Sequence, residues 1–87
     1  MYDVLLSPDA QKVYQKASRA LAKKIARCLM QLEQNPQIHP NIKALKGELA
    51  GYHRYRLGNY RVLYIINNQE AKVWVVAIAH RSKVYKP

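Results

Sequence analysis

Residues 52–79 read YHRYRLGNYRVLYIINNQEAKVWVVAIA, and they predict three β-strands joined by two short turns. β-branched and aromatic residues predominate in three runs, which Gly58-Asn59 and residues 67–70 separate. The expected strands are residues 52–57, 60–66 and 71–79. Because turns this short join neighbouring strands, the three should form an antiparallel meander. The last strand is apolar on both faces, which predicts a central position or a cover on each face.

The N-terminal part of the chain predicts a further strand and a first helix. Residues 2–6 are apolar and favour a short strand. Ser7, Pro8 and Asp9 then match a helix start: an N-cap, a proline at the first helical position, and a carboxylate near the positive helix end. Apolar residues follow at helical spacing, so a helix should begin here.

A second helix is expected between Ser18, another N-cap candidate, and Asn35-Pro36, which would end it. Its apolar stripe consists of Leu21, Ile25, Cys28 (or Leu29) and Leu32. Residues 36–51 contain two prolines and two glycines, and we expect an irregular connection there. The predicted fold is α+β, with an N-terminal strand, a two-helix hairpin and a three-stranded antiparallel meander. The hairpin should cover one face of the sheet.

The composition indicates a small folded domain with an anionic partner. The chain has 87 residues, 49% of them hydrophobic, and a net charge of +10 from 15 basic and 5 acidic residues. Such a charge repels itself, so we expect nucleic acid as the partner, then an acidic protein, then a membrane surface. Cys28 is the one cysteine, and no apolar run approaches the ~20 residues of a membrane span. We therefore expect a cytoplasmic protein without a disulfide framework.

Residues 51–61 contain three arginines, three tyrosines and no acidic residue. Arg54 and Arg56 are two residues apart, so on a strand they share a face. Arg61 follows the Gly58-Asn59 turn and can fold back beside them. Single-stranded RNA, which offers phosphates and stacking bases, matches such a surface.

The candidate chemistry is RNA cleavage without a metal. The three histidines lack metal-ligand spacing, and the sequence has no glycine-rich phosphate loop and no convincing serine triad. A basic and aromatic set remains, consisting of Arg54, Arg56, Arg61, His80, Arg81 and Tyr85. The arginines would stabilise charge as a 2′-hydroxyl attacks phosphorus, and His80 or Tyr85 would protonate the leaving 5′-oxygen. The general base stays open between Glu48, a perturbed histidine and a deprotonated tyrosine.

Three segments together resemble the RelE/ParE superfamily of toxins from type II toxin–antitoxin modules. They are residues 45–51 (LKGELAG), 52–64 (YHRYRLGNYRVLY) and 79–85 (AHRSKVY). The resemblance implies one toxin domain over residues 1–87 with the RelE fold, which is similar to that of microbial ribonucleases. It also implies a ribosome-dependent mRNA endonuclease that cuts in the ribosomal A site, leaves 2′,3′-cyclic phosphate and 5′-hydroxyl ends, and needs no metal or other cofactor. Its partners would be the ribosome, mRNA and a cognate acidic antitoxin.

The resemblance also suggests roles for individual residues. Arg61 and Arg81 match the phosphate-stabilising arginines of the family, and Tyr85 matches a late tyrosine tied to base stacking and catalysis. The predicted catalytic residues are Arg61, Arg81, Tyr85 and His80, and the predicted RNA-binding residues are Arg54, Arg56, Lys46 and Lys83. Arg54 and Arg56 stand where some members carry lysines. Because arginine is hard to deprotonate, any proton transfer by those lysines would need another group here.

Two other functions fit parts of the same pattern. The ParE branch shares the fold but inhibits DNA gyrase and generally lacks the catalytic set, so Arg61, Arg81 and Tyr85 favour the RelE branch. A plain RNA-binding module would carry the same charge without cleaving RNA. A nuclease should lose its toxicity when Arg61 or Tyr85 is replaced, whereas a gyrase inhibitor should damage DNA rather than stop translation.

Overall fold

The computed structural model describes residues 1–83, which form a five-stranded β-sheet with the order β1-β5-β4-β3-β2. The strands are β1 (Asp3–Leu6), β2 (Ile42–Ala44), β3 (His53–Leu57), β4 (Tyr60–Asn67) and β5 (Lys72–His80). β1 runs parallel to β5, and the other neighbouring strands pair antiparallel. The predicted meander and the predicted central position of its last strand are therefore confirmed.

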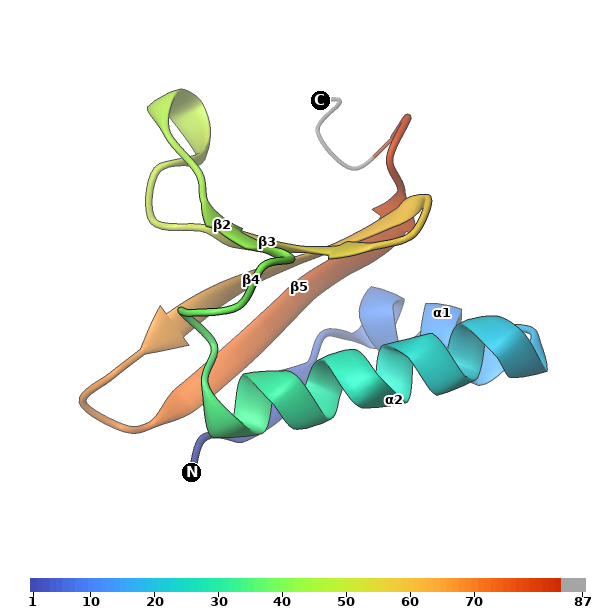
Figure 1. Cartoon of the computed structure of the whole chain (residues 1–87), viewed down its shortest axis with the longest axis horizontal. Coiled ribbons are helices and arrows are strands. Elements are labelled where there is room, and N and C mark those ends of the chain that lie inside the picture. The colour runs from blue at the N-terminus through green and yellow to red at the C-terminus, as the bar shows by residue number, and fades with distance from the viewer. Residues whose placement is uncertain (84–87) are drawn as a thin grey trace.

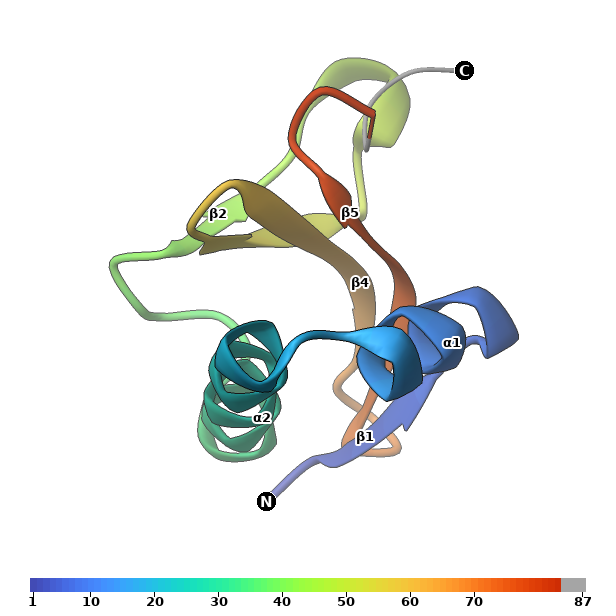
Figure 2. The ribbon, with the colours of Figure 1, turned by 90° about the vertical axis from the view of Figure 1, so that its right-hand side faces the viewer.

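Two helices, α1 (Pro8–Lys16) and α2 (Arg19–Gln34), cover one face of this sheet (Figures 1 and 2). Ser7 and Ser18 are the N-caps, and each side-chain oxygen accepts a hydrogen bond from the backbone N–H three residues later. Asn35 is the C-cap of α2. Both predicted helix starts and the predicted end are confirmed, since capping depends on neighbouring residues only.

The core lies between the helices and the sheet face that they cover. Its fully buried side chains from α2 and the two central strands include Ile25, Cys28, Leu32, Val62, Tyr64, Val73 and Val75. The Tyr64 hydroxyl donates a hydrogen bond to the Pro36 carbonyl over 2.7 Å. Burial raises the pKa of the Cys28 thiol to about 12, so this cysteine behaves as a small apolar core residue.

The prediction of an irregular connection over residues 36–51 is wrong in part. This segment contains β2, which pairs antiparallel with β3, and the 3₁₀ helix η1 (Gly47–Leu49). β2 has only three residues, and its partner lies after the next turn of the chain, so local periodicity carries almost no signal for it. The other four strands begin and end within one residue of the predicted bounds.

A β-bulge interrupts the pairing of β4 with β5. Leu63 pairs with Ala77, but the next residue of β4, Tyr64, pairs with Val75, so Val76 is an extra residue in β5. The Val76 carbonyl accepts a hydrogen bond from Ser7 Oγ over 3.0 Å, which ties the bulge to the start of α1. Beyond the bulge the alternation of β5 is reversed, and Ile78 rather than Ala77 enters the core.

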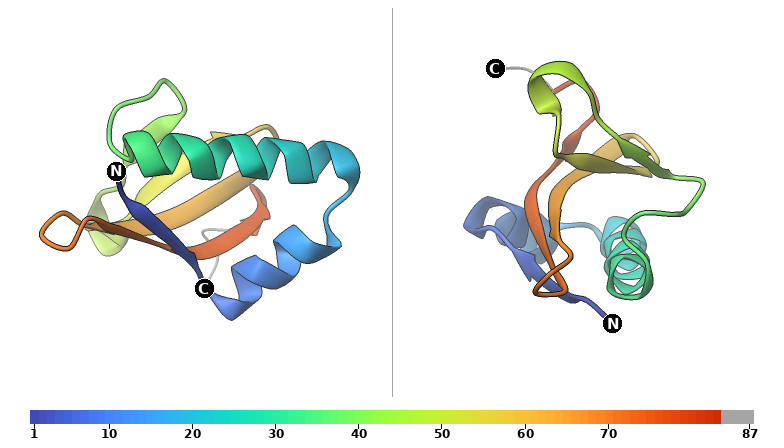
Figure 3. Two further views of the ribbon diagram at one scale, coloured as in Figure 1. Left: turned by 90° about the horizontal axis from the view of Figure 1, so that it is seen from below. Right: turned by 90° about the vertical axis from the view of Figure 1, so that its left-hand side faces the viewer.

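The other face of the sheet is not covered by α1 or α2. The segment that carries η1 and residues 81–83 both project on this side, while the helices lie on the other (Figures 1 and 3). We call this surface the open face. It carries the arginines that the sequence singled out.

Candidate functional site

Strands β3 and β4 bring three arginines together at one end of the open face. Arg56 lies directly opposite Arg61 across the ladder, and Arg54 lies two residues further along β3, opposite Leu63. Their neighbours Tyr55 and Val62 point the other way into the core. Because side chains alternate along a strand, the arginines must share the open face, as predicted.

Backbone carbonyls hold two of these guanidinium groups. Arg54 is half-buried and donates from Nη1 to the Asn41 carbonyl over 2.9 Å. Arg61 donates from Nη1 to the carbonyls of Gly58 and Tyr60 over 2.8 and 2.9 Å. Gly58 has φ +60°, which suits the first central position of a type II′ hairpin turn and which L side chains rarely adopt. The turn thus orients the Arg61 guanidinium and limits its rotamer freedom.

The neighbouring positions on β5 are small. Ala79 lies opposite Arg61, and Ala77 lies opposite Leu63. Short side chains beside the arginines leave space for a group that binds to them. Lys43 of β2 extends the cluster, since it lies opposite Arg54 on the outer side. Sequence reasoning missed Lys43 because its position on this face depends on the unpredicted strand β2.

Arg81 follows β5 and lies beside the same turn. Its backbone N–H donates to the Asn59 carbonyl over 2.8 Å, and its side chain is exposed. Lys83 and Lys46 are also exposed, in the two segments that project on this side of the sheet. Tyr85 lies outside the described residues. The structure therefore brings Arg54, Arg56, Arg61 and Arg81 to one end of the sheet.

Arg54, Arg56 and Arg81 form no ion pair with an acidic side chain within residues 1–83. Lys72 Nζ and Glu70 Oε1 do form an ion pair, over 3.9 Å, at the opposite end of β5. Glu48, a candidate general base, is exposed in η1. The described part of the chain also has no group of three metal-ligating side chains. The arrangement is suited to binding an anion such as a phosphate.

The described geometry separates His80 from the arginines. His80 is the cross-strand partner of Tyr60 on the helix-covered side, and the two rings meet edge to face at 5.7 Å. Its Nδ1 lies 2.9 Å from Ser82 Oγ. The bulge at Val76 causes this placement, since an unbulged β5 would direct His80 to the open face. A phosphate on the arginines would meet His80 only around the end of the sheet.

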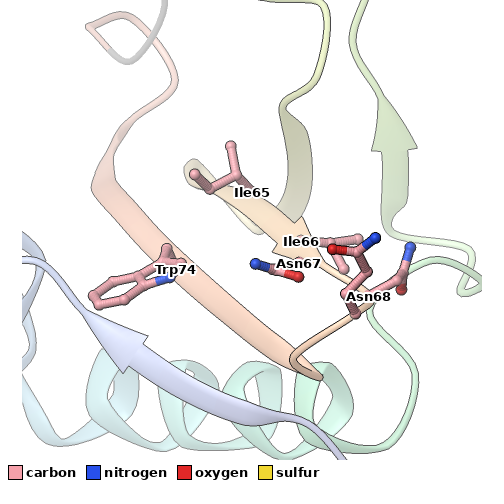
Figure 4. Close-up of a pocket in the computed structure, with 6 residues that line it drawn as sticks. Ile65, Ile66, Asn67, Asn68 and Trp74 are labelled. Atoms are coloured by element: carbon pink, nitrogen blue, oxygen red, sulfur yellow. The ribbon is translucent and has the colours of Figure 1, made fainter.

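The other end of the open face is apolar. Trp74 and Ile65 are cross-strand partners, with 45% and 36% of their surface exposed. They line a shallow depression of about 480 Å³ together with Asn67 at the end of β4 and Asn68 in the following turn (Figure 4). The open face thus combines cations at one end with exposed hydrophobic surface at the other.

A family model shows to which group the chain belongs. The model described as the ParE toxin of the type II toxin–antitoxin system parDE matches residues 4–85. The chain belongs to the RelE/ParE superfamily of type II toxins. The protein named Toxin RelE from Mycobacterium tuberculosis is 32% identical over 88 residues, which cover 98% of this chain and 87% of that protein.

Solved structures of RelE proteins have the same fold. In a RelBE toxin–antitoxin complex from Mycobacterium tuberculosis, one chain is 31% identical with a TM-score of 0.76, and the match covers 92% of this toxin and 98% of that chain. A RelE–RelB complex from Pyrococcus horikoshii matches with 24% identity and a TM-score of 0.80, over 95% and 98% of the two chains. The predicted RelE fold is confirmed. No helix within residues 1–83 is long and apolar enough to cross a membrane.

Proposed function

We propose that this toxin is a ribosome-dependent, metal-independent mRNA endonuclease that stops translation. The observation that carries the proposal is the pair of arginines, Arg56 and Arg61, that lie directly opposite each other on the face of the sheet away from α1 and α2. Two like charges directly opposite each other on a sheet destabilise the fold. A phosphate bound between them would remove that repulsion, and the negative charge of its transition state would bind more strongly still.

The reaction would be an internal transesterification. The 2′-hydroxyl of one nucleotide attacks the adjacent phosphorus and gives its proton to a general base, for which Glu48, a perturbed histidine and a deprotonated tyrosine are the candidates. The bond from phosphorus to the 5′-oxygen then breaks, and this oxygen takes up a proton. The products are a 2′,3′-cyclic phosphate and a 5′-hydroxyl. Arg61 and Arg81 would stabilise the charge on the phosphoryl oxygens, and Arg54, Arg56, Lys46 and Lys83 would bind the RNA backbone.

Tyr85 and His80 are the two candidates for protonating the leaving 5′-oxygen. Tyr85 would stack on a base or protonate the leaving 5′-oxygen, as the family resemblance suggests. His80 is the weaker proton donor, because the bulge directs it to the other side of the sheet. We therefore expect His80→Gln to keep more activity than Tyr85→Phe.

An acidic antitoxin is the second partner that we propose. The related structures of RelE proteins are complexes of toxin and antitoxin. Here the arginines and the exposed Trp74 lie on one face, so a segment with both carboxylates and apolar side chains would match it. Ribosomes and mRNA as targets imply that the toxin acts in the cytoplasm.

Primer extension on a defined mRNA, with and without programmed ribosomes, tests the function. Arg61→Ala should lower the cleavage rate roughly 100- to 1,000-fold, the scale of a lost oxyanion donor. Lys12→Ala removes a cation from exposed α1 and serves as the matched control. If folded Arg61→Ala cleaves within about threefold of the wild type, the assigned role of Arg61 is wrong.

Gyrase inhibition is the alternative, because the matching family model carries the ParE name. A gyrase inhibitor should leave mRNA intact and block supercoiling by purified gyrase. Intact mRNA under both conditions together with inhibited supercoiling would therefore replace the proposed nuclease. Binding of RNA without any cut would leave only an RNA-binding module.

A further inference from the structure

The helical side of the molecule carries a second concentration of positive charge. Between Asp9 and Glu33 the chain has six basic residues and no acidic one. They are Lys12, Lys16, Arg19, Lys23, Lys24 and Arg27, and all six are exposed. None forms an ion pair within residues 1–83. The proposed catalytic face lies on the other side of the sheet, so it does not account for this charge.

Part of this charge converges on a groove. The groove has a volume of about 190 Å³ and lies between α2 and β3, with Lys24 and Arg27 on the helix side and Arg56 on the strand side. None of the described residues that line it is acidic. β2 pairs with residues 53–55, and just before it Asn41 accepts a hydrogen bond from the Arg56 backbone N–H over 2.8 Å. Asn41 also lines the groove, which therefore lies where the chain enters β2.

The groove is connected to the arginines of the open face. A Cβ placed on Gly58 would lie 3.6 Å from Lys24 Nζ, so this ammonium group reaches from α2 to the β3–β4 turn. The carbonyl of the same glycine accepts a hydrogen bond from Arg61. Arg56 lines the groove and is also the cross-strand partner of Arg61. Positive charge thus continues around the edge of the sheet from the open face to α2.

We propose that this groove binds a phosphodiester of RNA, in addition to the phosphate held at the open face. Three cationic residues that line one groove repel each other unless an anion lies between them, and they raise the local concentration of anions. The Arg27 guanidinium can bind the non-bridging oxygens of a phosphate, and the Lys24 ammonium adds charge. The inference rests on the proposed function in that the anion is taken to be RNA.

The phosphate could come from the mRNA strand or from ribosomal RNA. Both present the same chemistry, and binding experiments separate them. The first probe is a short single-stranded RNA with 2′-O-methyl groups, which lacks the attacking hydroxyl and stays intact. The second probe is a ribosome programmed with the same methylated sequence. Each is titrated with full-length wild-type protein over a range of salt concentrations.

The test variant is Lys24→Gln/Arg27→Gln, and the matched control is Lys12→Gln/Lys16→Gln. Both remove two exposed positive charges from a helix, but only the first changes the groove. We expect the groove variant to bind about tenfold more weakly and its plot of log affinity against log salt to flatten by about 0.7 per phosphate lost. The control should keep the wild-type slope. The swap Lys24→Arg/Arg27→Lys keeps both charges and should restore binding.

Each outcome decides the proposal. Weaker binding to the free RNA identifies the mRNA strand, and weaker binding to ribosomes alone identifies ribosomal RNA. Equal losses for the groove and control variants would mean that only net charge matters, which overturns the site. If the groove variant binds both probes as tightly as the wild type, the proposal is also overturned, even if this variant no longer binds an antitoxin. Because these titrations do not require cleavage, failure of the nuclease in primer extension would leave the groove result standing.

Discussion

Arg56→Glu should make the protein more stable and inactive at the same time. Arg56 and Arg61 are direct cross-strand partners, so the wild type carries two like charges on adjacent strands. At about 6 Å in water, two unit charges repel by about 0.7 kcal/mol. Glutamate converts this repulsion into an attraction of similar size. Arg27 and Lys24 across the groove act in the same direction.

The size and the salt dependence of the effect follow from screening. At about 10 mM salt the Debye length is about 30 Å and hardly weakens the interaction, so the swing from repulsion to attraction amounts to about 1 kcal/mol. At about 1 M salt the Debye length is about 3 Å, and roughly 0.2 kcal/mol should remain. In a domain of this size, 1 kcal/mol corresponds to a rise in Tm of about 4–8 °C. Activity should be lost at any salt concentration, since a carboxylate repels the phosphate.

Urea unfolding of the wild type, Arg56→Glu and Arg56→Gln at both salt concentrations measures this. The Gln variant has nearly the shape of the Glu variant and should give half of its stabilisation at low salt. Lys46→Gln loses the same charge from an exposed position before η1 and corrects for the net charge of the protein. The reasoning is wrong if Arg56→Glu is less stable than the wild type at low salt. It is also wrong if the stabilisation is as large at about 1 M salt as at about 10 mM, because repulsion between the two arginines should be screened at the higher concentration.

Three further predictions concern the core. Tyr64→Phe leaves the buried Pro36 carbonyl without its 2.7 Å hydrogen bond, which should cost about 1–3 kcal/mol in thermal unfolding; a loss below about 0.5 kcal/mol would contradict that bond. Burial lowers the pKa of His53, so the unfolded protein takes up a proton at a higher pH than the folded protein does. The free energy of unfolding should therefore fall as the pH drops below about 6.5, and this fall should be smaller in His53→Phe. Burial raises the pKa of Cys28 to about 12, so a thiol reagent at pH 8 should react only in urea, and fast labelling of the folded protein would disprove this.

The arginine cluster illustrates how function and stability oppose each other. A sheet selected for stability alone would not put Arg56 opposite Arg61, because a neutral residue in place of Arg56 would remove the repulsion. Such conflicts between local rules and the observed residues are typical of functional sites. The pair of opposed arginines therefore indicates a functional site on the open face, and this inference does not depend on the family to which the chain belongs.

Local features of the chain were sufficient for most of the elements. Ser7, Ser18 and Asn35 bound the helices because capping involves residues only a few positions apart. The Gly58-Asn59 turn and the alternation of residues 54–61 put three arginines on one face, since a tight hairpin sets its own register. These interactions join residues that are close together in the sequence, so the sequence alone is sufficient to predict them.

Long-range pairing decided the rest, and no local pattern could supply it. β2 exists only because Ile42–Ala44 finds its partner in β3, and the groove beside α2 forms only where α2 and β3 come together in the fold. The bulge at Val76, which Ser7 holds from far away in the sequence, reverses the alternation of β5 and moves His80 away from the arginines. One inserted residue changes the face of every side chain that follows, and whether it is inserted depends on how the strands and α1 pack together.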